Sequence, residues 1–498
     1  MIMKQKIKVD LNILTRTFAT ILIITLFFVY LLKGENIYVD LYTVALAACI
    51  SLLTIVFLVI EKRRENPFVI LLSLYVLLFY VFRVITLNIE PYTRGMNFVG
   101  ERTVNDVNST LLFILFSLFF LFMGLVTIKI KKIKTSYSKL REGNYSAIFM
   151  FVMLSFLVSY LFELTSMFGG NKFLSYYLSI FHPAVVLLFF LVFYYVNKQK
   201  AYSKNMIVLL LVVLLSYVLL TTLAGGRKTL LSIIMNITVI FFVIKSRVYL
   251  SLRMFFIVIF FGGVAFVLYD ISTFFRWMKY EQLIILNESL DFSSLFLTYL
   301  DKGLMQTEGF AKIFDRIGFL DYEVDSMAGA DLYGKVINPL YYLKSIIDNI
   351  IPGFSYFDVV RASQTKFFLQ EFGYVPNNEE FRELNYNSQY IGGFSEMYTL
   401  FKGYFSIPIF YLVGLLFTYC YSVINLRDPY YAVLLRVLIL LSFVGGAGFL
   451  ESFGFDWHVI KLFFMLIAII LTYPLFRSRY REEHKTSSNI NPVLNIIE

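Results

Sequence analysis

Long apolar runs separated by short polar segments dominate the chain. A helix of about 20 apolar residues is long enough to cross the hydrocarbon core of a bilayer. The pattern therefore predicts an all-α, polytopic integral membrane protein with about twelve transmembrane helices. The runs fall at about 17–32, 41–60, 67–87, 109–128, 146–166, 176–196, 206–223, 229–244, 254–271, 404–425, 430–450 and 457–476.

One long polar stretch, residues 272–403, interrupts this pattern between the ninth and tenth runs. It contains 17 Asp and Glu against 11 Lys and Arg. Its scattered aromatic residues have helix-like spacing, which favours a folded lid of amphipathic helices over a disordered linker. The predicted organisation is nine spans in 1–271, the lid in 272–403, three spans in 404–476 and a tail in 477–498.

The basic residues between the runs predict the orientation. Alternating the gaps from the N-terminus assigns 24 Lys and Arg to the side that holds both termini and 6 to the short gaps on the other side. Cytoplasmic segments carry the excess of positive charge, so both termini are predicted to be cytoplasmic and the lid extracytoplasmic. The first run lacks a small-residue cleavage site, which favours a retained helix over a signal peptide.

Composition excludes several classes of protein. Hydrophobic residues make up 59% of the 498 residues and charged residues only 16%, which no soluble fold tolerates. The net charge of +10 resides in the short segments between spans, so it indicates topology and not nucleic-acid binding. Cys49 and Cys420 are far apart in apolar runs and predict neither a disulfide framework nor a metal cluster.

Ionisable residues in or beside the spans gather near their predicted outer ends. A charge within a membrane is costly and is therefore a functional hypothesis. Any one of these residues is equally well read as an interfacial anchor, but the set predicts a polar cavity that faces outward. Its members are Arg83, Glu163, His182, Arg227, Asp270, Arg276, His458 and Lys461.

A glycine pair followed by two cations stands between the seventh and eighth spans. Gly225 and Gly226 allow a sharp turn and close backbone approach, and Arg227 and Lys228 supply positive charge beside the start of the next helix. This arrangement suits a phosphate group. The alternative is a tight hairpin with exposed basic residues.

A second group of candidate residues closes the lid. Tyr390, Gly392 and Gly393 are suited to forming a packed groove, and Glu396 follows at the predicted membrane surface. Two interpretations of Glu396 stay open: a structural partner for an arginine, or a base or orienting group for a sugar hydroxyl.

Arginines of the lid are candidates for a pyrophosphate clamp. A guanidinium binds phosphate oxygens in a bidentate manner, although a single arginine in such a segment is more often a solvated surface charge. The candidates are Arg276, Arg316, Arg361 and Arg382.

In these features the chain resembles the Wzy-type polysaccharide polymerases, which polymerise the oligosaccharide repeat units of O-antigen, capsule and related bacterial glycans. The likeness spans about residues 220–425. It is carried by Gly225-Gly226-Arg227, by Ile351-Pro352-Gly353 with Arg361 downstream, and by Ile391-Gly392-Gly393-Phe394-Ser395-Glu396 leading through Phe401 and Gly403 into a span with Gly414-Leu415-Leu416.

The resemblance implies a metal-independent glycosyltransferase without cofactors. It would move a growing glycan from undecaprenyl pyrophosphate onto a newly flipped lipid-linked repeat unit, at the outer face of the bacterial inner membrane. Glu396 is then the first candidate for aligning or deprotonating the acceptor hydroxyl, and His182 the second. Membrane lipid, a flippase and a chain-length regulator are the further partners implied. The predicted pyrophosphate ligands are Arg83, Arg227, Lys228, Arg276, Arg361 and Arg382.

Other functions compete with this one. An O-antigen ligase shares the donor and the lid but would more typically present a histidine in the lid, and the three histidines here lie outside 272–403. A lipid-linked oligosaccharide flippase would have short loops and charges in both membrane halves. A structural scaffold leaves the outer charges unexplained.

Overall fold

The computed structural model describes residues 8–61, 66–89, 102–130, 215, 239, 243, 249–251, 319–350, 356–360, 369, 373, 375, 393–424 and 429–444. The chain divides into two compact units. The first, here the large unit, holds residues 1–131, 218–423 and 437–462; the second holds 132–217, 424–436 and 463–498. Most of the described residues belong to the large unit.

Five helical segments among the described residues are long and apolar enough to cross a membrane. They confirm the runs predicted at 17–32, 41–60, 67–87, 109–128 and 404–425, and the chain is a multi-pass membrane protein. Their bounds are Leu11–Lys33, Leu41–Glu61, Pro67–Leu87, Val104–Thr127 and Gly403–Val423.

The remaining predicted runs are described in part or not at all. Helix α22 (Pro429–Val444) covers most of the run at 430–450. Single helical positions are described at Leu215, Val239 and Val243. The rest of the runs at 146–166, 176–196, 206–223, 229–244, 254–271 and 457–476 lies outside the described residues.

The first three spans follow one another with short connections. Helix α1 (Leu11–Lys33) begins before the predicted residue 17 because Asp10 caps it, accepting the Asn12 N–H at 3.0 Å. Helix α2 (Leu41–Glu61) forms the second span. The third is made of α3 (Pro67–Val76), the π-helical η1 (Leu77–Val81) and α4 (Phe82–Leu87).

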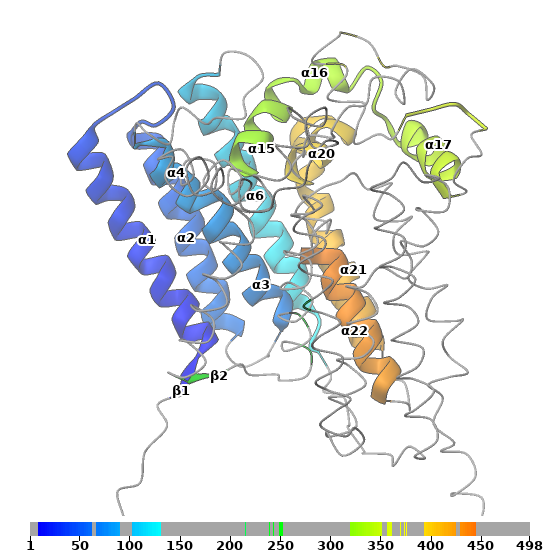
Figure 1. Cartoon of the computed structure of the whole chain (residues 1–498), viewed down its shortest axis with the longest axis horizontal. Coiled ribbons are helices and arrows are strands. Elements are labelled where there is room, and N and C mark those ends of the chain that lie inside the picture. Colours follow the sequence, from blue (N-terminus) through cyan, green and yellow to red (C-terminus); the bar gives the residue numbers. More distant parts are fainter. Residues whose placement is uncertain are drawn as a thin grey trace, which may run out of the picture. The chain divides into compact units, whose positions relative to one another are not determined.

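The fourth span packs along its length against the span Gly403–Val423, which is the tenth predicted run. Helix α6 (Val104–Thr127) lies beside α21 (Ile407–Val423), which is preceded by the 3-10 turn η3 (Gly403–Ser406) (Figure 1). Gly124 of α6 and Gly414 of α21 meet at the crossing, where the two backbones are in contact. Small residues at a crossing let membrane helices approach this closely.

Polar contacts define two ends of the large unit. At one, here the Asn36 end, the Asn36 amide donates to the Leu87 carbonyl (3.0 Å), so the α1–α2 connection meets the end of the third span. At the other, the Asn12 end, the Asn12 amide donates to the Leu58 carbonyl (2.9 Å). The Asn36 amide also donates to the Asn88 side chain (3.1 Å). Residues 33–40 and 88–108 are two of the short gaps that the alternation of spans assigns to one side of the membrane, and this contact agrees with it.

A short antiparallel ladder at the Asn12 end was not predicted. Strand β1 (Lys8–Asp10) pairs with β2 (Tyr249–Ser251), with Lys8 opposite Ser251. Three-residue strands carry no period-2 signal, so the pairing depends on tertiary structure. The ladder joins two segments that the positive-inside rule assigns to the same side, and the described fold is otherwise all-α.

Four short helices of the lid lie at the Asn36 end (Figure 1). They are α15 (Phe319–Ala328), α16 (Ala330–Tyr333), α17 (Pro339–Ile350) and α20 (Gly393–Leu400). Helix α15 contacts α6, η1 and α20. The described part of the lid is therefore folded and joined to the spans.

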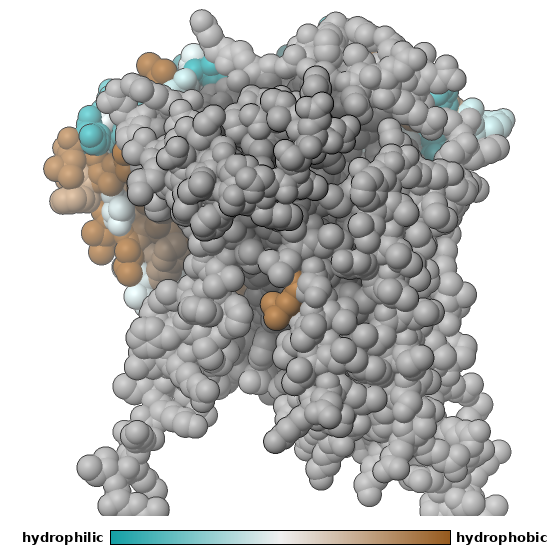
Figure 2. Space-filling view, in the orientation of Figure 1, coloured by the Kyte–Doolittle hydropathy of each residue, from teal (hydrophilic) through white to brown (hydrophobic). Residues whose placement is uncertain are grey.

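Apolar side chains cover the outside of the first spans. Figure 2 shows them on the side where α1 lies, and they include the exposed Ile24, Phe28, Leu31 and Leu32. A surface of this kind is stable in contact with lipid chains. The polar contacts between the lid and the spans lie instead at the Asn36 end.

Candidate functional site

Three carboxylates of α15 join the lid to the spans. Asp321 and Asp325 are one helical turn apart and share a face, whereas Glu323 points to another side of the helix. All three are buried. A buried carboxylate needs a compensating charge or hydrogen bonds, and each of these has them.

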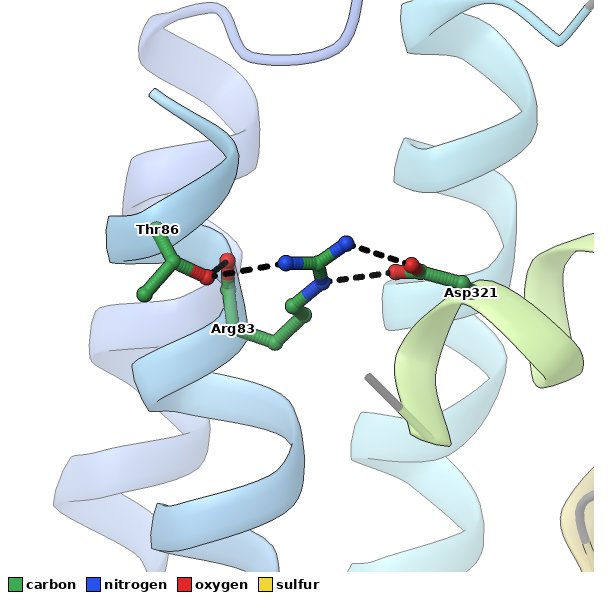
Figure 3. Close-up of polar contacts among 3 residues, drawn as sticks. All are labelled: Arg83, Thr86 and Asp321. Atoms are coloured by element: carbon green, nitrogen blue, oxygen red, sulfur yellow. Dashed lines mark hydrogen bonds and ion pairs between the residues drawn. The ribbon is translucent and has the colours of Figure 1, made fainter. Parts of the chain in front are cut away.

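Asp321 binds Arg83 of the third span (Figure 3). The guanidinium is bidentate: its Nε lies 3.0 Å from Oδ1 and its Nη2 2.6 Å from Oδ2. Its Nη1 donates to the Thr86 hydroxyl at 3.3 Å. The Arg83 side chain is 1% exposed and that of Asp321 0%. Such a pair is rigid and excludes water.

Glu323 caps the N-terminus of α20. Its Oε2 accepts the Ser395 N–H at 2.6 Å and its Oε1 accepts the Phe394 N–H at 3.2 Å. The Tyr80 hydroxyl of η1 donates to the same Oε1 at 3.0 Å. A carboxylate at this place binds amides that have no partner within the helix and complements the helix dipole. Glu323 thus links the third span to α20.

Burial raises the pKa of the Glu323 carboxyl above its ordinary value, although the hydrogen bonds from Ser395, Phe394 and Tyr80 oppose the shift. A raised pKa means that the folded state binds the proton more tightly than the unfolded state. The contribution of Glu323 to stability is then largest below the ordinary pKa of 4.5 and is lost as the pH rises through the raised value.

Replacing Glu323 with glutamine should remove this pH dependence. We expect the unfolding temperature of wild type, relative to Glu323→Gln, to fall as the pH rises from below 4.5 towards neutral. The measurement is thermal unfolding of both proteins in one detergent over a pH series. Glu35→Gln, at an exposed glutamate of the same end, is the matched control. A difference that stays constant with pH would contradict the assignment.

Asp325 makes the third connection. Its Oδ1 accepts from Arg102, with Nη2 at 2.7 Å and Nε at 3.0 Å. Arg102 stands just before α6, so α15 is joined both to the third span and to the entry of the fourth. This pair is more exposed than Arg83–Asp321, and solvent screens it more strongly.

Glu396 lies on α20, in the turn that Glu323 caps. Its side chain is buried, and its Oε1 accepts a hydrogen bond from the hydroxyl of Tyr342 on α17. The sequence left open an arginine partner or a catalytic role, and the structure adds the phenol of Tyr342 as a hydrogen-bond partner. A buried carboxylate paired with a hydroxyl is an arrangement that can align a second hydroxyl or accept its proton.

The structure brings three of the predicted site residues to one end of the large unit. Arg83 lies in the last helix of the third span, Gly393 begins α20 and Glu396 follows it. The guanidinium of Arg83 is bound by Asp321, so its role here is to hold α15; pyrophosphate binding by Arg83 stays a prediction. The other predicted residues lie outside the described residues: Tyr390, Gly392, Gly225, Gly226, Arg227, Lys228, His182, Arg276, Arg361 and Arg382.

Sequence reasoning missed the role of α15. The string Asp321-Tyr322-Glu323-Val324-Asp325 was assigned to no predicted site. The signal that could have identified it is the alternation of three carboxylates with apolar residues, since acidic groups within a buried helix require cationic or hydroxyl partners elsewhere. Within the described part of the chain, no group of three or more His, Cys, Asp or Glu could hold a metal ion.

No protein family, curated protein or solved structure matches the chain.

Proposed function

We propose that the chain is a membrane glycosyltransferase of the Wzy type. It polymerises undecaprenyl-pyrophosphate-linked repeat units into a surface polysaccharide such as O-antigen or capsule. The same lipid-linked oligosaccharide serves as donor and acceptor. The site faces outward from the bacterial inner membrane, and both termini are cytoplasmic.

The position of Glu396 is the observation that carries this proposal. The carboxylate is buried on α20, which ends just before the span Gly403–Val423 begins. Helix α15 contacts α20 and joins it to the third span, and Tyr342 of the lid binds the carboxylate. A carboxylate at this depth meets a sugar whose lipid anchor remains in the bilayer. Low polarity around the site strengthens the contacts that align the reacting hydroxyl.

The predicted alternation of sides, though not which side is cytoplasmic, agrees with the contacts at the two ends of the large unit. Segments predicted to be cytoplasmic meet in the β1–β2 ladder. Segments predicted to be extracytoplasmic meet through Asn36, through Arg102 and through the contacts of α15. Strands β1 and β2 can pair only if the chain crosses the membrane an even number of times between Asp10 and Tyr249. The eight predicted spans between these residues satisfy this condition.

In this reaction the protein must neutralise the leaving group and accept a proton from the acceptor. The anomeric carbon of the growing glycan loses its pyrophosphate and forms a bond to the acceptor oxygen, which gives up its proton. Cations neutralise the leaving pyrophosphate, and Arg227 with Lys228 are the preferred candidates. Glu396 aligns the acceptor and takes the proton, with His182 as the second candidate.

Deletion of the gene separates this function from its competitors. A polymerase deletion leaves surface glycan with a single repeat unit on a gel. A ligase deletion leaves long polymer on the lipid carrier, and a flippase deletion leaves repeat units on the cytoplasmic side. Either of the last two results would overturn the proposal.

Glu396→Gln tests the role of the carboxylate. The amide oxygen still accepts from Tyr342, so the fold is retained, but the amide cannot take a proton. We expect chain extension to fall on the order of 100-fold or more, measured as long-chain glycan in a complemented deletion strain. The protein should remain at wild-type abundance in the membrane.

Glu35→Gln is the matched control, because Glu35 is exposed at the same end of the large unit and lies far from Tyr342 in the sequence. It should extend chains normally. Normal extension by Glu396→Gln would remove Glu396 from the reaction and leave it with a structural role.

A further inference from the structure

Helix α17 has one buried face and one exposed apolar face. Tyr342, Ser345 and Asp348 are buried. On the opposite side, Leu340, Leu343 and Ile347 are 60%, 54% and 43% exposed. Spacings of three and four residues place these three side chains in one stripe along the helix.

The buried face fixes the helix to the lid and to α20. Tyr342 binds Glu396 and belongs to a buried cluster, against which Leu400 at the end of α20 packs. The described core of the lid therefore packs on the buried face of α17 and leaves the stripe exposed. The other members of the cluster are Tyr333, Ile337 and Leu369.

Two aromatic side chains extend the apolar surface beyond the end of α17. The carboxylate of Asp348 accepts the N–H groups of Tyr356 (2.8 Å) and Phe357 (2.9 Å), which fixes both residues. Tyr356 is largely exposed and Phe357 partly so. The ammonium of Lys344 lies 5.5 Å from the centre of the Phe357 ring, so a cation borders the surface.

The depth of α17 follows from its neighbours. Leu400 packs on the cluster that contains Tyr342, and the span Gly403–Val423 begins three residues later. Tyr404 and Phe405 at that boundary are exposed, as expected of rings at a membrane interface. Figure 1 shows α17 at the same end as α15 and α20. Helix α17 is therefore close to the level at which α21 enters the bilayer.

We propose that the exposed face of α17, with Tyr356 and Phe357, is embedded in the headgroup and upper acyl region of the adjacent leaflet. An apolar stripe, aromatic rings and a flanking lysine are the features of a helix that lies in the interface plane. Lipid is the occupant because the adjacent span Gly403–Val423 is long and apolar enough to cross a bilayer and begins with the exposed rings of Tyr404 and Phe405. The lysine would bind lipid phosphate. In this way the leaflet holds the lid, through Tyr342, over the carboxylate of Glu396.

Fluorescence quenching by spin-labelled lipid tests this proposal on the full chain. Leu343→Cys is made in a Cys49→Ser, Cys420→Ser background, labelled with an environment-sensitive fluorophore and reconstituted in phosphatidylethanolamine–phosphatidylglycerol nanodiscs. We expect a blue shift of the emission and loss of most of the fluorescence when the nanodisc contains lipid with a nitroxide near the headgroup. Leu340→Cys, in the same stripe, serves if Leu343→Cys is poorly produced.

Asp331→Cys is the matched control, at an exposed position of the neighbouring α16. Its label should keep its fluorescence. Equal quenching at both positions, or quenching at neither, would overturn the proposal. Energy transfer between two copies labelled at position 343, without quenching by lipid, would assign the surface to a second copy instead. The experiment reads lipid contact alone, so its failure leaves the glycosyltransferase proposal untouched.

Discussion

Alanine in place of Gly124 should separate α6 from α21. A Cβ added at this position would lie 2.2 Å from the carbonyl oxygen of Tyr411 and 2.9 Å from the amide nitrogen of Leu415. Both atoms belong to the backbone of α21, so no side-chain rotation relieves the overlap. We expect a destabilisation of about 3 kcal/mol or more, at the upper end of overpacking effects.

The partner glycine should behave in the same way. A Cβ at Gly414 would lie 2.5 Å from the carbonyl oxygen of Leu121. Separation of the helices would also cost the hydrogen bond from the Thr418 hydroxyl to the Leu125 carbonyl, which measures 3.2 Å. The two substitutions act on one crossing, so their effects should not add.

Thermal unfolding in detergent measures both variants, with Gly334→Ala as the matched control. Gly334 follows α16 with φ of −62°, which alanine tolerates, and its nearest contact is a single carbonyl at 3.1 Å. We expect it to unfold near the wild-type temperature. Equal unfolding temperatures for Gly124→Ala and Gly334→Ala would show that α6 and α21 do not cross at the glycines.

The spans could be predicted from the sequence because a bilayer sets their length. The run at 67–87 and the helix Pro67–Leu87 coincide, and the run at 41–60 differs from Leu41–Glu61 by one residue. The first helix was predicted to begin too late because its early turns contain Asn12, Thr15 and Arg16, which lower the hydropathy. The Asp10 cap starts the helix regardless of that polarity.

The partners at the candidate site could not be predicted in this way. Arg83 and Asp321 are 238 residues apart, and Tyr342 and Glu396 are 54 apart. The residues around one member of a pair do not indicate the other member. Hydropathy along the chain predicts how deep a residue lies in the membrane, but not which distant residue it contacts. The sequence did place Arg83 and Glu396 at the same side of the membrane, and both are found at the Asn36 end. Their mutual connection, through α15 and α20, required the fold.

Three links in series connect the third span to Glu396. Arg83 fixes Asp321, the same helix presents Glu323, and Glu323 caps the turn that carries Glu396. Tyr80, within the π-helical η1, adds a second contact from the span. A change at Arg83 or Asp321 should therefore affect the position of Glu396 without any direct contact to it.

Asp321→Ala should destabilise the protein by about 3 to 5 kcal/mol, because it leaves the guanidinium of Arg83 buried and without its counter-charge. Thermal unfolding measures the loss, and Asp331→Ala, at an exposed carboxylate of α16, should change the unfolding free energy by no more than about 0.5 kcal/mol. The double variant Arg83→Met, Asp321→Leu removes both charges and fills the site with apolar atoms, so it should recover most of the stability. If the double variant is less stable than Asp321→Ala, the ion pair does more than neutralise one buried charge, and the geometry of its two parallel hydrogen bonds is what holds α15 on the spans.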